Sequence, residues 1–245
     1  MKRTIDILVS LFGLLITAPI LLVFMYLVYR QDKHSPFYFA PRVGKDNHIF
    51  TMVKLRSMKK NADKSGVDST SANDKRITKV GHLIRKYKLD EITQLWNVLK
   101  GDMSLVGPRP NVKNDTDKYT ETEKKLLSIK PGITDFSSIV FSDEGEILRD
   151  QENPDLAYNQ LIRPWKSRLG IIYIENRSTI LDLQLIFYTV IAIISKASAL
   201  KWINNKLNQL NVDELVIQIS ARTEKLTPYP PPGADVVVSD DQQTN

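Results

Sequence analysis

The longest apolar run opens the chain. From Ile5 to Tyr29 the residues are apolar apart from Asp6, Ser10 and Thr17. A helix rises about 1.5 Å per residue, so this run is long enough to cross a bilayer. It is longer than the apolar core of a signal peptide, and no small-x-small cleavage site follows it. The pattern therefore predicts a membrane helix over residues 1–33.

Charges at both ends of this run, and a proline near its middle, favour a helix that does not span. Lys2 and Arg3 precede the run, and further cations follow Tyr29. The positive-inside preference then places both ends in the cytoplasm, which one straight span does not allow. Pro19 leaves a carbonyl without its helical donor and bends a helix. We expect a re-entrant helix that breaks at Ala18-Pro19, although a straight span also satisfies the hydropathy.

The pattern after residue 33 is mostly helical. The run at 48–55 is rich in β-branched and aromatic residues and predicts a strand, and the short aromatic run at 36–41 is either an edge strand or an aromatic anchor in the membrane interface. Residues 61–75 are polar and predict a loop. Helical spacing then recurs through most of the remaining chain, at 77–88, 89–100, 114–129, 155–175, 180–194 and 200–210. The expected fold class is α+β, mostly helical, with a small β element on the catalytic domain.

The C-terminal third changes character twice. The apolar segment 180–194 is too short to span, since a span needs about 20 residues, so it lies in the core or along the membrane. The amphipathic segment 200–210 is an interfacial helix or an interaction element. From about Thr223 the chain is rich in proline and then polar, which predicts disorder. The expected division is a membrane helix at 1–33, a catalytic domain at 34–196, and an extension at 197–245.

Composition narrows the chemistry. The chain has 245 residues, a net charge of +6 and no cysteine. It therefore has no disulfide, thiolate zinc site or cysteine nucleophile. A basic balance suits nucleic acid, an anionic membrane face or phosphorylated substrates. The cations form no long stripe and flank acids, which argues against a nucleic-acid binder.

Trp165, beside Lys166 and Arg168, fits either a membrane interface or ordinary packing.

Two adjacent carboxylates are the main candidates for chemistry. Asp90 and Glu91 precede an apolar helical face that ends before Gly101, a residue suited to a helix C-terminus. They therefore fall in the first turn of a helix, beside its free N–H groups. Arg85 precedes them and Arg109 follows them. Acids among cations at a helix N-terminus suit a phosphate ester and a metal ion, although capping alone also explains such a pair.

Two further groups of cations lie elsewhere in the chain. Gly107-Pro-Arg-Pro110 is a rigid turn that presents Arg109 from a fixed backbone. Lys54 and Arg56 lie at the end of the strand predicted at 48–55, and on the residues alone they are solvated surface charges.

Four runs, in order, resemble the bacterial sugar transferase family, the monotopic phosphoglycosyl transferases of glycoconjugate biosynthesis. They are Phe50-Thr-Met-Val-Lys-Leu-Arg-Ser-Met58, Lys88-Leu-Asp-Glu91, Gly101-Asp-Met-Ser-Leu-Val-Gly-Pro-Arg-Pro110 and Lys130-Pro-Gly-Ile-Thr134. The resemblance covers roughly residues 1–195. Its specificity comes from the co-occurrence of the runs, since each alone is weak.

The resemblance implies transfer of a phosphosugar from a UDP-sugar to polyprenyl (undecaprenyl) phosphate, with release of UMP. The enzyme would act at the cytoplasmic face of the bacterial inner membrane and supply downstream glycosyltransferases. A carboxylate is ionised at pH 7, so Asp90 would act as nucleophile without a base. Glu91 would hold Mg²⁺. The substrate-binding residues would be Lys54, Arg56, Arg85, Arg109 and Pro110.

The chain departs from the family pattern at two positions. Ala18 stands where a serine usually precedes the proline of the re-entrant helix, which leaves Thr17 as the nearest hydroxyl for the freed carbonyls. Asp135 stands where the family usually has glycine, so that loop is expected to differ. Two other functions stay open on the residues alone: a membrane-anchored scaffold without chemistry, and a hydrolase of nucleotide-sugar diphosphates that uses water as acceptor.

Overall fold

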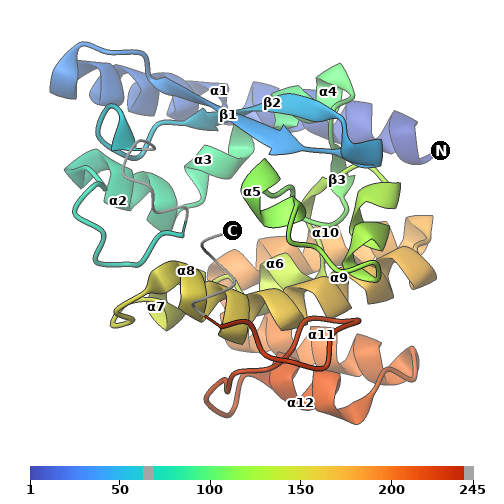
Figure 1. The fold of residues 1–245 in the computed structure, drawn as a ribbon. Coiled ribbons are helices and arrows are strands. Elements are labelled where there is room, and N and C mark those ends of the chain that lie inside the picture. The colour runs from blue at the N-terminus through green and yellow to red at the C-terminus, as the bar shows by residue number, and fades with distance from the viewer. Residues whose placement is uncertain (63–68, 240–245) are drawn as a thin grey trace.

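A computed structural model describes residues 1–62 and 69–239. Figure 1 shows one long helix, α1 (Lys2–Asp32), along one edge of the molecule, and the helices α11 and α12 at the opposite edge. The expectation of a mostly helical α+β fold is confirmed, since the strands form two small two-stranded sheets. The predicted loop at 61–75 lies partly outside the described residues.

The helix α1 is long and apolar enough to cross a membrane, and only 11% of its apolar window is buried. It runs through Ala18 and Pro19 as one helical segment. Thr17 donates its hydroxyl to the Gly13 carbonyl at 2.6 Å. This bond lies within the preceding turn. The carbonyl that Pro19 leaves without a backbone donor is a different one, that of Leu15. The break at Ala18-Pro19 stays a prediction.

The N-terminal end of α1 is bound to the rest of the protein by polar side chains. Lys2 donates to Asp182 at 2.6 Å, and Arg3 donates to the carbonyls of Val98 and Leu99 at 2.5 and 2.7 Å. Asp6 is buried and accepts from the Ser104 hydroxyl at 2.9 Å and from the Leu105 N–H at 3.0 Å. A buried carboxylate needs such donors, so this end of the helix is fixed in place.

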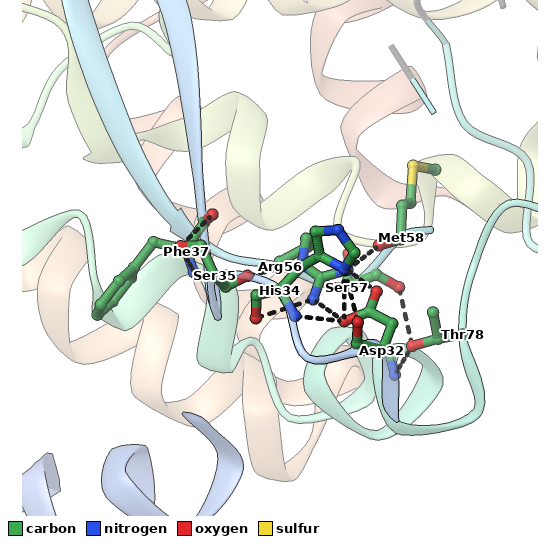
Figure 2. A network of polar contacts seen from close by, with 9 residues as sticks. Asp32, His34, Ser35, Phe37, Arg56, Ser57, Met58 and Thr78 are labelled. Atoms are coloured by element: carbon green, nitrogen blue, oxygen red, sulfur yellow. Dashed lines mark hydrogen bonds and ion pairs between the residues drawn. The ribbon is translucent and has the colours of Figure 1, made fainter. Parts of the chain in front are cut away.

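The other end of α1 is bound as well. Arg56 donates through two nitrogens to the two carboxylate oxygens of Asp32, at 2.6 and 2.7 Å. Figure 2 shows this pair within a polar network that also contains His34 and Ser35. Arg56 lowers the pKa of Asp32 to about 2, against a smaller effect of burial. Both ends of α1 therefore contact the same domain.

The first sheet is a hairpin that follows α1 in the chain. β1 (Phe37–Val43) and β2 (Ile49–Leu55) are antiparallel, and Phe37 lies opposite Leu55. The short 3₁₀ turn η1 (Lys45–Asn47) joins them. The strands begin and end within about two residues of the predicted ranges.

The segment that contains the carboxylate pair folds as three short helices. They are α2 (Lys79–Lys86), α3 (Leu89–Ile92) and α4 (Leu95–Lys100). The single helix expected at 89–100 is thus interrupted after Ile92. The buried Thr93 donates its hydroxyl to the Val53 carbonyl at 3.0 Å, and the Asn97 side chain bonds the Val53 N–H and the Thr51 carbonyl. These bonds attach the segment to β2. Gly101 ends α4 at φ 98°, as predicted.

The second sheet pairs two of the motif runs. β3 (Ser104–Val106) and β4 (Gly132–Thr134) are parallel, and the backbones of Gly107 and Gly132 touch. A Cβ at Gly107 would lie 2.6 Å from the Lys130 carbonyl oxygen, closer than real Cβ atoms approach. Both glycines are therefore required for this close approach. The pairing fixes the backbone from which Arg109 projects.

The segment between β3 and β4 is less helical than expected. It contains α5 (Lys113–Thr116) and the 3₁₀ helix η3 (Glu123–Ser128). The predicted capping box is confirmed: the Glu123 N–H donates to the Thr120 hydroxyl at 3.1 Å, and the Thr120 N–H donates to the Glu123 carboxylate at 3.0 Å. Glu123 is fully buried and pairs with Arg163.

Helices make up the C-terminal half. They are α6 (Phe136–Val140), α7 (Glu144–Ile147), α8 (Pro154–Ala157), the π-helix η4 (Tyr158–Ile162), α9 (Arg163–Asn176), α10 (Thr179–Ile194), α11 (Lys196–Gln209) and α12 (Glu214–Ala221). Asp135 is the N-cap of α6 and accepts from the Ser138 N–H at 2.8 Å. The main core extends from Ala40 through Phe136 and Leu169 to Ile203 and Val216. The C-terminal helices are therefore part of one core with the catalytic domain.

The tail differs from the disorder predicted after Thr223. Tyr229 stacks on Trp165 with ring centroids 4.5 Å apart, and Arg168 lies 4.8 Å above the Tyr229 ring. Arg168 also donates to the Pro230 carbonyl at 2.9 Å. Trp165 is buried beneath this segment, so it belongs to the packing and not to a membrane interface. The predicted disorder of residues 240–245 lies outside the described residues.

Candidate functional site

The backbone turns sharply just before the carboxylate pair. Lys88 has a left-handed conformation with φ 55°, which is uncommon for a residue other than glycine. It is followed at once by α3, so Asp90 and Glu91 lie in the first turn of a helix, as predicted. One carboxylate oxygen of Asp90, Oδ1, is buried and has no hydrogen-bond partner in the described part of the chain. A buried oxygen of this kind is available to an incoming group.

Glu91 and Arg109 form the central ion pair of the site. A guanidinium nitrogen of Arg109 lies 2.9 Å from Glu91 Oε1, and the Lys88 ammonium lies 3.9 Å from the same oxygen. Burial raises the pKa of Glu91, but Arg109, Lys88 and Lys54 together lower it to about 2. Glu91 in turn raises the pKa of Arg109. Both groups are therefore charged across the physiological range.

Two further cations face Asp90. Burial and the nearby Arg109 together lower the pKa of Lys54 to about 8, against the opposing charge of Asp90. Arg85 donates to the Ser57 hydroxyl at 3.0 Å. Burial lowers the pKa of Arg85, and Asp90 is the largest opposing influence. The structure thus brings Lys54, Arg85 and Arg109 together around one carboxylate.

The two remaining substrate-binding predictions have other contacts. Arg56 is engaged by Asp32 and the Ser35 carbonyl, so a phosphate would have to compete with that pair (Figure 2). Pro110 is buried, and the carbonyl of the next residue, Asn111, accepts from the Val43 N–H at 3.0 Å. This hydrogen bond connects the turn that contains Arg109 to the β1–β2 hairpin.

The sequence analysis missed one acidic residue of this site. Glu144, at the start of α7, forms an ion pair with Lys166 of α9. Burial raises the pKa of Glu144, but Lys166, Arg109 and Lys88 lower it overall. Glu144 lies more than fifty residues from Asp90 in the chain, and no local pattern connects the two. Only the fold could identify it.

The site suits a magnesium ion only when the phosphate group of a bound substrate supplies further oxygens. Within residues 1–62 and 69–239 no three His, Cys, Asp or Glu side chains are grouped to hold a metal. Magnesium is usually held by one or two protein carboxylates plus substrate phosphates and water. Glu91 supplies one such carboxylate beside Arg109, while phosphate oxygens and water would complete the set. The donor set suits a metal that arrives with a phosphate group.

The family model of the bacterial sugar transferases matches residues 1–196, from α1 to the start of α11. The protein therefore belongs to the bacterial sugar transferase family.

Several characterised or named relatives are similar to the chain. It is 44% identical over 118 residues to a putative undecaprenyl-phosphate N-acetylgalactosaminyl 1-phosphate transferase of Bacillus subtilis, over 48% of this chain and 66% of the relative. It is 41% identical over 144 residues to galactosyl transferase CpsE of Streptococcus agalactiae, which covers 54% of this chain and 32% of the relative. It is 40% identical over 149 residues to undecaprenyl-phosphate galactose phosphotransferase of Salmonella typhimurium, which covers 55% of this chain and 31% of the relative. The chain thus spans about a third of the length of the last two proteins.

Proposed function

We propose that the protein transfers a sugar 1-phosphate from a UDP-sugar to polyprenyl phosphate, and that Asp90 forms a covalent phosphosugar intermediate. The observation that carries the proposal is the buried, unpartnered Oδ1 of Asp90 among Lys54, Arg85 and Arg109. An anionic nucleophile set among cations suits attack on an anionic phosphorus. The names of the relatives support a sugar phosphate as the group transferred and undecaprenyl phosphate as the acceptor.

The proposed reaction has two displacements at one phosphorus. In the first, Asp90 Oδ1 forms a bond to the sugar-linked phosphorus, and the bond from that phosphorus to the UMP oxygen breaks with its electron pair. In the second, an oxygen of polyprenyl phosphate attacks the same phosphorus, and the bond to Asp90 breaks. The carboxylate is regenerated, and no external proton, oxidant or reductant is needed. An acyl phosphate is reactive enough for the second displacement.

The surrounding cations reduce the repulsion between anions. Arg109 is held by Glu91 and presents a planar fork that fits a phosphate. Lys54 and Arg85 add positive charge beside Asp90. Glu91 would hold Mg²⁺ with the diphosphate, and a bound ion would neutralise further charge there.

The decisive experiment measures UMP release from a panel of UDP-sugars with undecaprenyl phosphate and magnesium. UMP release that requires the lipid acceptor, stops with EDTA and yields a lipid-linked phosphosugar supports the proposal. Release of sugar phosphate to water would favour the hydrolase instead. A failure with every UDP-sugar would favour the scaffold.

The activity should fall at high pH because Lys54 loses its charge. Its pKa is lowered from 10.5 to about 8, so the ammonium is present below that pH and is lost above it. Since kcat/KM reports the free enzyme, we expect kcat/KM for the UDP-sugar to decline above about pH 8. Lys54→Arg should move this decline upward, whereas Lys59→Arg at an exposed site should not. An unchanged profile in Lys54→Arg would exclude Lys54 as the titrating group.

The contacts of α1 support a re-entrant topology at the cytoplasmic face. Lys2 and Asp32, at opposite ends of the helix, both pair with residues of the catalytic domain. A helix that spans the bilayer would place one of these pairs on the far side. A UDP-sugar is cytoplasmic, so both ends would lie inside.

Cysteine accessibility tests this topology, because the chain has no native cysteine. Thr4 is exposed and lies beside Lys2 and Arg3 without replacing their contacts. A cysteine introduced by Thr4→Cys should resist an impermeant maleimide in intact cells and react after lysis, as should one introduced by Lys59→Cys. Labelling of Thr4→Cys alone in intact cells would show that α1 spans.

Helix α10 is expected to lie at the membrane interface. One of its faces is exposed and apolar, with residues spaced three or four apart: Ile180, Leu183, Phe187, Val190, Ile193 and Ile194. Trp202 of α11 stacks on Phe187 with centroids 5.3 Å apart. An aromatic pair beside an apolar helical face suits the headgroup region.

A further inference from the structure

The C-terminal extension contacts the active site through one short turn. Residues 141–144 join α6 to α7, and we name them the 141–144 turn. Asp143 in this turn accepts from Lys196, at the start of α11, at 2.5 Å, and lies 3.3 Å from the Arg222 guanidinium, which follows α12. Arg222 lies outside the matched family region, which ends at residue 196. It is therefore an addition to the family domain that reaches an internal turn of that domain.

Ser142 and Glu144 of the turn face the segment that contains Asp90. The Ser142 carbonyl accepts from the Lys88 ammonium at 3.4 Å, and Lys88 directly precedes α3. Glu144 pairs with Lys166, and its charge acts on Arg109. The turn thus contacts the catalytic cations on one side and the extension on the other.

Arg222 is built into the structure as a fixed residue. It ends α12 in a left-handed conformation with φ 56°, and its side chain is only 13% exposed. The guanidinium lies 5.4 Å above the ring of Phe141, the first residue of the turn. Asp143 is a partner for its charge at one guanidinium nitrogen, whereas Nε and the other terminal nitrogen are buried without a hydrogen bond among the described residues. Arg222 therefore contacts both ends of the segment Phe141–Asp143.

We propose that Arg222 is a positioning residue, which acts through Asp143 to hold Ser142 and Glu144 against the cations around Asp90. On this view α11 and α12 make the geometry of the site depend on residues beyond the family domain. The inference rests on the proposed function for its catalytic readout, but the position of the turn can be measured without any activity.

The test combines exchange and kinetics on Arg222→Gln in the full chain. Hydrogen–deuterium exchange of residues 141–148 should be at least several-fold faster than in wild type. The kcat for UMP release should fall about tenfold, while KM for the UDP-sugar stays within about twofold, because the turn orients the reacting cluster. Arg149→Gln is the matched control, since Arg149 is an exposed arginine paired with Glu146 in the same region.

A double-mutant comparison separates positioning from general destabilisation. If Arg222 acts through Asp143, Arg222→Gln in an Asp143→Asn background should cost no further activity. Independent, multiplicative losses would overturn the proposal, as would unchanged exchange at 141–148. Lys196→Gln gives a second variant if Arg222→Gln folds poorly, and it should show the same pattern to a smaller degree. Inactivity of the wild type with all UDP-sugars would contradict the proposed function, whereas the exchange result would still decide the role of Arg222.

Discussion

Asp90→Asn is expected to abolish phosphosugar transfer, with a loss on the order of 10⁴-fold or more. An amide is a poor nucleophile and does not form the acyl phosphate. The change preserves the size of the side chain, and Oδ1 of Asp90 makes no bond to another described residue, so the fold should be retained. Intact-mass measurement should show a phosphosugar adduct on the wild type after mixing with the UDP-sugar alone, and none on the variant.

Asp117→Asn is the matched control for this change. Asp117 is exposed after α5 and pairs only with Lys113 among the described residues, at 2.6 Å. The control should keep wild-type activity, and both variants should stay in the membrane fraction. Substantial turnover by Asp90→Asn, together with no adduct on the wild type, would contradict a covalent mechanism at this residue.

Arg109→Ala should cost on the order of 10²–10³-fold in kcat/KM, which corresponds to about 3–4 kcal/mol. It removes the charge that we propose to bind the diphosphate, and it leaves Glu91 without the partner that lies at 2.9 Å. Arg109→Lys should recover only part of the loss, since a point charge does not reproduce a planar fork. Steady-state kinetics with varied UDP-sugar measures both effects.

The thermal unfolding midpoint distinguishes catalysis from stability at Arg109. An uncompensated Glu91 destabilises the fold, so Arg109→Ala should also lower the midpoint. In Arg109→Ala/Glu91→Gln the midpoint should recover while activity stays low. Near-normal kcat/KM in Arg109→Lys would contradict a bidentate phosphate contact.

The sequence predicted well those parts of the fold that depend on neighbouring residues. Periodicity and capping account for the strands β1 and β2, the helices α10 and α11, the cap at Gly101 and the Thr120–Glu123 box. The placement of Asp90 and Glu91 in a first helical turn followed for the same reason. The motif runs around Gly107 and Gly132 were recognised as a set, and the structure supplies the reason, since they pair as parallel strands.

The parts that were missed depend on contacts between distant residues. Glu144 enters the site through a turn fixed by Lys88, Lys166 and Lys196, none of which is close to it in the sequence. The proline-rich tail was expected to be disordered because its composition has little to bury. It is ordered by stacking of Tyr229 on Trp165 and Arg168, which a composition argument cannot detect. Arg56 has the positive charge that a phosphate contact needs, but in the structure it pairs with Asp32.

The pairing of Lys2 with Asp182 has a consequence for the biosynthesis of the protein. The two residues are 180 positions apart, so Lys2 leaves the ribosome long before its partner exists. At synthesis rates of about 5–20 residues per second, this delay is roughly 10–40 seconds. During that interval the first residues of the apolar helix are unattached to the rest of the fold. We therefore expect the orientation of α1 to be set before the Lys2–Asp182 pair forms, and the completed fold to hold it afterwards.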